Sequence, residues 1–64
     1  MSIKNYSRVA LLTDGYVDEG VRSGSIGYVI EVYPGDKYEV EFSGDDGITI
    51  AQIVVSGHQI AVAN

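Results

Sequence analysis

The chain has 64 residues, a formal net charge of −5 and no cysteine. This length allows a single domain over residues 1–64, near the lower limit at which a hydrophobic core alone stabilises a fold. Without cysteine there is no disulfide, thiolate metal site or cysteine nucleophile, so apolar packing must supply the stability. Residues 1–7 contain no continuous apolar run, so we expect no signal peptide, no membrane association and a cytoplasmic location.

The acidic excess argues against nucleic acid as a partner. Nine Asp and Glu residues stand against four Lys and Arg residues. Phosphate backbones are bound by clustered cations, and the basic residues here are few and scattered. A basic protein partner fits this charge better. The alternative is that the charge only keeps a small protein soluble.

Glycines divide the chain into segments too short for a typical helix. Between them lie runs of β-branched and aromatic residues, which predict five short strands. The fold class is therefore all-β, with five antiparallel strands. The predicted strands cover Arg8–Thr13, Ile26–Tyr33, Lys37–Ser43, Ile48–Val55 and Gln59–Val62.

Residues 14–25 form the longest polar connection, about twice the usual loop length. Loops of this length are often functional, and this one places Tyr16 next to Asp18 and Glu19. These three residues are candidates for partner binding. The alternative is an ordinary loop that spans a small barrel.

The third predicted strand has the clearest alternation. Tyr38, Val40 and Phe42 alternate with charged and polar residues, so one face is predicted to be core and the other to face water. Turn sequences precede and follow this strand, which predicts a three-stranded meander over residues 26–55.

The fourth predicted strand is irregular, because its apolar residues change parity between Ile50 and Ala51. A bulge, or burial on both faces, would explain the change. The sequence Ser56-Gly57-His58 then interrupts the chain before the last strand.

The whole pattern resembles a family of small uncharacterised prokaryotic proteins, a domain of unknown function expected to be SH3-like and KOW-like. The matching features are Arg8–Leu12 with Asp14, Gly20-Val21, Gly24–Val32, Tyr38–Phe42, and Asp46-Gly47 with Thr49 and Ala51, followed by a terminal apolar strand. The resemblance implies a small five-stranded antiparallel SH3-like barrel, in which a single helical turn at Ser56-Gly57-His58 precedes the last strand. Family members are often encoded beside toxin-like proteins, which implies an immunity or antitoxin role. The segment 56–59 departs from the more polar or proline-containing turn of the family.

The sequence contains no recognisable catalytic or metal site. His58 is the only histidine, and it lies beside a glycine in a predicted turn. Asp45-Asp46-Gly47 lacks the ordered ligand spacing of a calcium loop and is typical of a turn. We therefore expect a non-enzymatic protein without cofactor or metal.

The leading hypothesis is an inhibitor that covers the cationic groove of a basic toxin, such as a nuclease, with carboxylates that mimic phosphate. Glu39 and Glu41 share the wet face of one predicted strand, and Glu31 lies on its hairpin partner. Tyr33 and Tyr16 are the candidates for exposed aromatic contacts. The alternative for the glutamates is a solvated face whose charges protect a sheet edge.

Other functions stay open. A small accessory subunit that docks onto a larger complex is the main alternative to an inhibitor. A nucleic-acid-binding barrel is disfavoured by charge, and no spacing of the tyrosines indicates a cage for a methylated cation. The sequence does not specify the oligomeric state.

Overall fold

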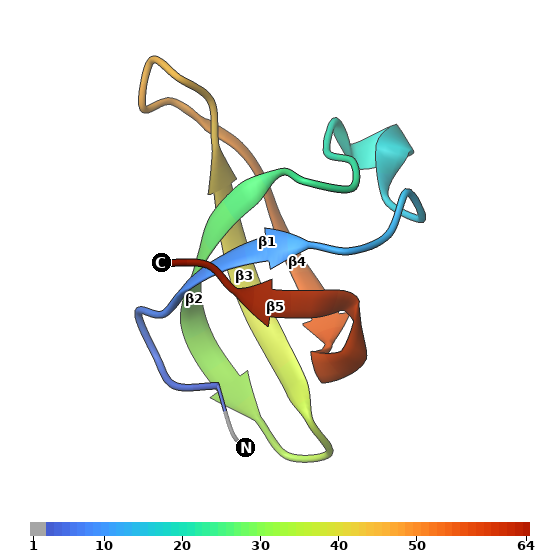
Figure 1. The fold of residues 1–64 in the computed structure, drawn as a ribbon, viewed down its shortest axis with the longest axis vertical. Coiled ribbons are helices and arrows are strands. Elements are labelled where there is room, and N and C mark those ends of the chain that lie inside the picture. The colour runs from blue at the N-terminus through green and yellow to red at the C-terminus, as the bar shows by residue number, and fades with distance from the viewer. Residues whose placement is uncertain (1–2) are drawn as a thin grey trace.

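The computed structural model describes residues 3–64, which form one antiparallel sheet of five strands (Figure 1). The predicted all-β class and the five predicted strands are confirmed, and the strand ends differ from the predicted ones by at most two residues. The elements are β1 (Arg8–Leu11), η1 (Val17–Glu19), β2 (Ile26–Tyr33), β3 (Lys37–Ser43), β4 (Thr49–Ser56), η2 (Gly57–Gln59) and β5 (Ile60–Val62).

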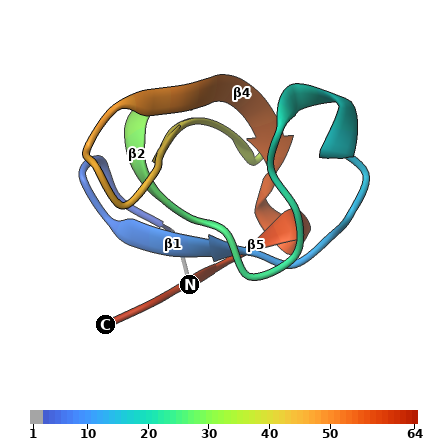
Figure 2. The same ribbon diagram turned by 90° about the horizontal axis from the view of Figure 1, so that it is seen from above.

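The strand order is β4-β3-β2-β1-β5, so β4 and β5 are the two edges of the sheet. The predicted meander is confirmed as β2-β3-β4. The sheet curls strongly, and β4 and β1 lie on opposite sides of the curl when the molecule is seen from above (Figure 2). No ladder joins β4 to β5 within residues 3–64, so hydrogen bonds do not close the sheet into a barrel.

The core fills the inside of the curl. Tyr38, Val40 and Phe42 are buried, as the alternation along β3 predicts. All ten buried side chains are apolar or aromatic, and no polar or charged residue among those described is buried. The core consists of Val9, Leu11, Val21, Val29, Tyr38, Val40, Phe42, Ala51, Val55 and Ile60.

Two register shifts bend the long strands. Val29 pairs with Val40 and Glu31 pairs with Glu39, so Ile30 is an extra residue in β2. Ile50 is likewise an extra residue in β4, which confirms the irregularity predicted there. Such bulges reverse the parity of the residues that follow them.

β2 and β3 approach each other most closely at Gly27. A Cβ atom on this residue would lie 2.7 Å from the carbonyl oxygen of Glu41 and 2.8 Å from Cδ1 of Phe42. Gly27 pairs with Val9 of β1 on one side and with Phe42 of β3 on the other. The absence of a side chain here therefore permits both halves of the sheet to pack around one core.

Hydrogen bonds from two separate segments of the chain hold the turn before β5. The predicted helical turn is confirmed as η2, which begins with a reciprocal pair of bonds between Ser56 and Gln59. The hydroxyl of Tyr16 donates to Oε1 of Gln59 at 2.8 Å, and the Ser56 N–H donates to the same oxygen at 3.0 Å. One glutamine side chain thus ties the long 14–25 loop to the junction of β4 and β5.

Replacing Phe42 by alanine should lower the free energy of unfolding by about 3–5 kcal/mol, because its ring is buried in the centre of the core. Tyr6→Ala is the control, since this ring is 79% exposed and its loss should change stability by less than about 0.5 kcal/mol. Equilibrium unfolding in urea measures both. Equal stability of the two variants would contradict the assigned core.

Candidate protein-binding face

The carboxylates of Glu31, Glu39 and Glu41 lie on one side of the sheet, which we call the acidic face. Glu39 and Glu41 alternate along β3 with the buried residues Val40 and Phe42, so they point away from the core. Glu31 of β2 is paired directly with Glu39 of β3. The structure therefore brings the three predicted glutamates together on one surface.

The bulge at Ile30 is what places Glu31 on this face. Val29 points into the core, and unbroken alternation would send Glu31 inward as well. The extra residue reverses the parity, so Glu31 and Tyr33 face outward opposite Glu39 and Lys37. Both Glu31 and Tyr33 are exposed.

Apolar and aromatic side chains surround the acidic face. Tyr28 is paired with Glu41 and is 49% exposed, and Val54 is paired with Glu39 and is 50% exposed. Tyr33 is 38% exposed at the end of the same face. The face thus combines carboxylates with rings that have polar tips, a mixture typical of protein-binding surfaces.

Glu39 is the centre of a small hydrogen-bond network. The hydroxyl of Tyr33 donates to Oε1 of Glu39, and the side-chain amide of Gln52 donates to Oε2. The Tyr33 bond, followed by the Gln52 bond, lowers the pKa of the Glu39 carboxyl below its ordinary value. The same bond, aided by desolvation and by the charges of Glu39 and Glu31, raises the pKa of Tyr33. Glu39 is therefore held ionised and Tyr33 protonated at neutral pH.

Gln52 and Tyr28 are members of this face that the sequence did not indicate. Gln52 belongs to β4, where it is paired with Glu41 and reaches diagonally to Glu39. A prediction of the β3–β4 register could have found Gln52, because that register places it opposite Glu41 and on the same side of β4 as Val54. Tyr28 needed the register of β2 against β3.

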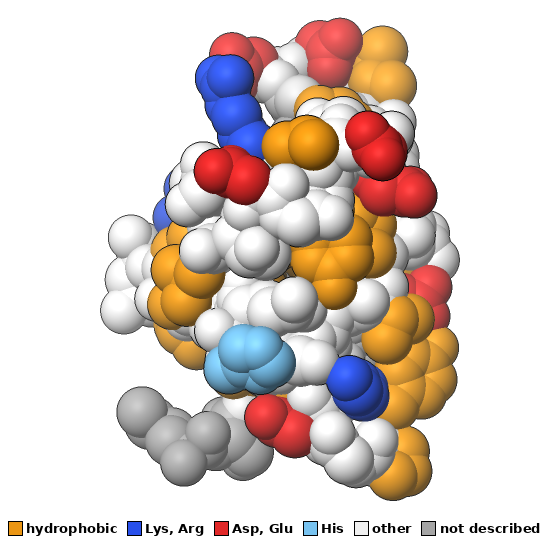
Figure 3. All heavy atoms as spheres, turned by 90° about the vertical axis from the view of Figure 1, so that its right-hand side faces the viewer, with side chains coloured by type: hydrophobic (Ala, Val, Ile, Leu, Met, Phe, Trp, Pro, Cys, Tyr) orange, Lys and Arg blue, Asp and Glu red, His pale blue; other side chains and the backbone are white. Residues whose placement is uncertain are grey.

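The basic side chains of the described residues make their hydrogen bonds elsewhere. Nζ of Lys37 donates to Oγ of Ser56 at 2.7 Å, and a guanidinium nitrogen of Arg8 donates to the carbonyl of Ala63 at 3.4 Å. The carboxylates within residues 3–64 accept their hydrogen bonds from backbone N–H groups, from the Tyr33 hydroxyl and from the Gln52 amide. In Figure 3 the blue side chains form no continuous patch on the side of the molecule that is shown. No Lys or Arg side chain within residues 3–64 is therefore hydrogen-bonded to a carboxylate of the acidic face.

The other predicted site residues lie in the 14–25 loop, away from the acidic face. Asp18 and Glu19 are exposed on η1, which Figure 1 shows at the opposite end of the molecule from the β2–β3 turn. Tyr16 differs from the prediction of an exposed contact, because it is partly buried against the core and bonded to Gln59. The chain distance of 43 residues between the two partners explains why the sequence did not reveal this contact.

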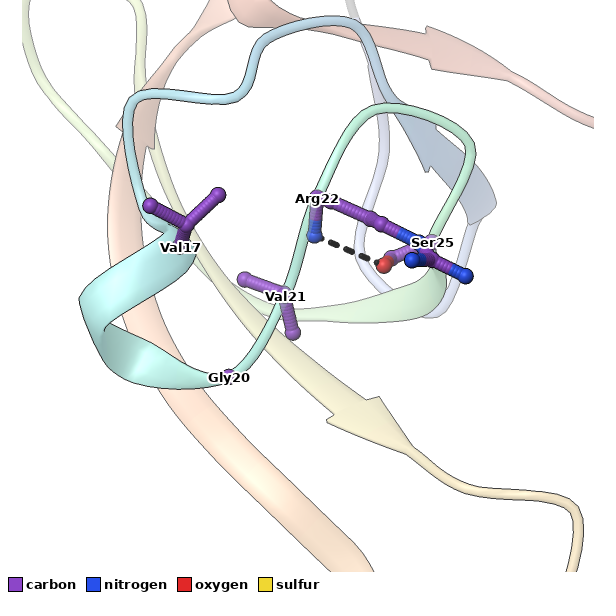
Figure 4. Close-up of a pocket in the computed structure, with 5 residues that line it drawn as sticks. All are labelled: Val17, Gly20, Val21, Arg22 and Ser25. Atoms are coloured by element: carbon purple, nitrogen blue, oxygen red, sulfur yellow. Dashed lines mark hydrogen bonds between the residues drawn. The ribbon is translucent and has the colours of Figure 1, made fainter.

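An open pocket lies inside the 14–25 loop. Its lining includes Val21 and Arg22, with the Arg22 N–H bonded to Oγ of Ser25 at 3.0 Å (Figure 4). The lining contains one ionisable side chain, Arg22, and no carboxylate or histidine that could act as a base for Ser25. The arrangement offers no nucleophile with a base.

The aspartates that superficially resemble a calcium loop accept hydrogen bonds from backbone N–H groups of their own loops. Oδ1 of Asp46 accepts the Ile48 N–H at 3.0 Å, and Oδ1 of Asp14 accepts the Ser23 N–H at 2.9 Å. Within residues 3–64 no three His, Cys, Asp or Glu side chains gather as metal ligands would. His58 is exposed on η2.

The family to which the chain belongs follows from its match to a family model. The model of a domain of unknown function, DUF4926, matches residues 5–62. The chain is a member of this family. Searches of curated proteins and of solved structures give no significant match. Among the described residues, no helix has the length and apolar character needed to cross a membrane.

The hydrogen bonds of Glu39 make the fold sensitive to pH at both ends of the range. Because folding lowers the pKa of Glu39, the network stabilises the protein above the ordinary carboxyl pKa, and this stabilisation is lost as the pH falls through the lowered value. Because folding raises the pKa of Tyr33, its contribution is lost as the pH rises through the raised value.

Replacing Tyr33 by phenylalanine should raise the pKa of Glu39 towards its ordinary value, since the variant lacks the hydroxyl that lowers it most. Gln52→Ala should raise it less, and Tyr28→Phe should leave it unchanged. Carboxyl carbon chemical shifts followed by NMR against pH measure all three. An unchanged pKa in Tyr33→Phe would rule out the hydroxyl as the cause.

Proposed function

We propose that this chain is a non-enzymatic, cytoplasmic protein-binding domain that binds a basic protein through the acidic face. The partner that suits this surface best is a toxin with a cationic groove, such as a nuclease, so the role is that of an immunity protein or antitoxin. The carboxylates of Glu31, Glu39 and Glu41 replace phosphate groups in that groove. Binding occludes the groove, and the long-range attraction speeds association.

The pairing of Glu31 with Glu39 is the observation that carries this proposal. Like charges directly opposite each other in a sheet are destabilising. Arg8 and Lys37 donate their hydrogen bonds to Ala63 and Ser56, so neither side chain is bonded to a carboxylate of the acidic face. A surface that reduces the stability of a small domain is typical of a functional site, and a basic partner would relieve the repulsion.

The rings beside the glutamates add the apolar contacts that a stable complex needs. Tyr28 and Tyr33 are both partly exposed on the acidic face, where each can stack on a partner side chain. Tyrosines at the centre of an interface often contribute much of the binding energy. The Tyr33 hydroxyl is already bonded to Glu39, so its ring is oriented before the partner arrives.

We also assign the curled sheet to the SH3-like class. The order β4-β3-β2-β1-β5 and the single helical turn before β5 support this assignment. In such a fold the outer side of the β2-β3-β4 meander is a rigid surface, which suits the display of charged side chains.

The test begins with recovery of the partner from the native cell by affinity capture and mass spectrometry. Surface plasmon resonance then compares the wild type with the triple variant Glu31→Gln, Glu39→Gln and Glu41→Gln at two salt concentrations. We expect the triple variant to associate at least about tenfold more slowly and to lose most of the salt dependence, because it lacks the steering charges. The triple variant should have the circular dichroism spectrum of the wild type.

A control variant separates the acidic face from net charge. Asp18→Asn, Glu19→Gln and Asp45→Asn remove the same number of charges from exposed positions outside the face. This control should keep most of the wild-type association rate. Equal slowing of both variants would show that net charge alone steers the partner, and unchanged rates in the acidic-face variant would overturn the proposed function.

A further inference from the structure

The outer edge of β4 carries backbone groups that the sheet does not use. The N–H of Gly57 donates to the carbonyl of Asp36 at 2.9 Å, continuing the β3–β4 register in which Val55 opposes Tyr38. Antiparallel ladders bond through alternate residues, so Val55 and Ile53 direct their N–H and C=O groups towards β3. The backbone groups of Gln52 and Val54 therefore point away from the sheet. No turn, loop or side chain within residues 3–64 bonds to them.

Beyond the bulge at Ile50, this edge lacks the features that normally protect an exposed strand. β4 has eight residues, none of them charged and none of them proline. Val54 is 50% exposed and Ile50 is 51% exposed. The opposite edge, β5, has only three residues. Natural edges are usually shortened, charged or interrupted because an unprotected edge can accept another strand.

The charges beside β4 determine which strand fits. Glu39 and Glu41 lie on β3, the neighbouring strand, and their side chains point to the outer side of the sheet. A strand added to β4 would run about 10 Å from β3, two strand spacings away. Lysine or arginine side chains on the outer side of that strand can reach towards these carboxylates. A second copy of this chain would instead bring another net charge of −5.

We propose that the edge of β4 accepts an extended basic segment of the protein partner as a sixth antiparallel strand. This inference rests on the proposed function, because it states how the basic partner docks beside the acidic face. Main-chain bonds to Gln52 and Val54 provide the attachment, and the glutamates select cationic side chains. The partner segment therefore alternates basic residues with apolar ones, the apolar residues lying on the side of Ile53.

Lys37 fixes which part of the added strand is basic. Its ammonium group is bonded to Ser56 at the end of β4, so a cation placed there would be repelled. Gln52 lies at the other end of the free edge, opposite Glu41. The strongest preference for lysine or arginine is thus beside Gln52.

A synthetic peptide tests this docking mode. The probe is a capped peptide of about nine residues that alternates lysine with valine, and its control has glutamate in place of lysine. With isotope-labelled protein, the lysine peptide should shift the amide signals of Gln52 and Val54 and slow their hydrogen exchange at least about tenfold at saturation. The glutamate peptide should do neither.

Proline substitution provides the matched variants. Val54→Pro deletes an N–H that points outward, so it leaves the bonds between β3 and β4 in place. Val54→Ala removes the apolar side chain but keeps the N–H. The lysine peptide should bind Val54→Pro about tenfold more weakly than Val54→Ala. If Val54→Pro does not fold, the exchange measurement on the wild type decides.

The outcomes separate this inference from the proposed function. A peptide that shifts signals around Glu31 and Glu39 but leaves the exchange of Val54 unchanged would overturn strand addition and leave the acidic face as the binding surface. Slowed exchange at Val54 with equal affinity in the Glu31, Glu39 and Glu41 triple variant would overturn the role of the glutamates. Absence of peptide binding overturns the inference. A dimer in sedimentation with Val54 already protected would show that a second copy occupies the edge, which also overturns it.

Discussion

The repulsion between Glu31 and Glu39 is the interaction on which the account of the outer surface of this protein depends. The two residues are paired across β2 and β3. Tyr33 and Gln52 stabilise the charged form of Glu39 with two hydrogen bonds, whereas the recorded bond to Glu31 is a single one from the Val32 N–H at 3.3 Å. The network thus holds one carboxylate in place and leaves its neighbour free to interact with a partner.

The inside of the sheet makes this surface possible. Gly27 lets β2 lie so close to β3 that a Cβ would collide with the backbone of Glu41, and the core fills the curl beneath. With an apolar core and no buried charge among the described residues, the charged residues are all displayed outside. The fold therefore supports the acidic face as a rigid surface, and the unused edge of β4 lies along its border.

Much of this arrangement could be predicted from the sequence, because β3 alternates so regularly. Tyr38, Val40 and Phe42 had to be inside, and that placed Glu39 and Glu41 outside. The parity change at Ile50 likewise signalled a bulge, which the register confirms.

What could not be predicted depends on contacts between distant residues. The bulge at Ile30 leaves no clear mark in the sequence of β2, yet it decides that Glu31 and Tyr33 face outward. The bond from Tyr16 to Gln59 joins opposite ends of the chain, and the bond from Gln52 to Glu39 needs the register of β4. The open edge of the sheet could not be predicted either, because the sequences of β4 and β5 do not show whether these two strands pair.

The most direct test of the account is the stability of Glu31→Gln at low and high salt, measured by urea unfolding. Glutamine keeps the shape of the side chain and removes its charge, and Glu19→Gln is the control for net charge because Glu19 lies on η1, away from the sheet. The account predicts that Glu31→Gln is more stable than the wild type by about 0.2–1 kcal/mol at low salt and that the gain shrinks as salt screens the pair. Glu19→Gln should gain less. A Glu31→Gln variant no more stable than the wild type would contradict the claim that the acidic face carries unrelieved repulsion awaiting a basic partner.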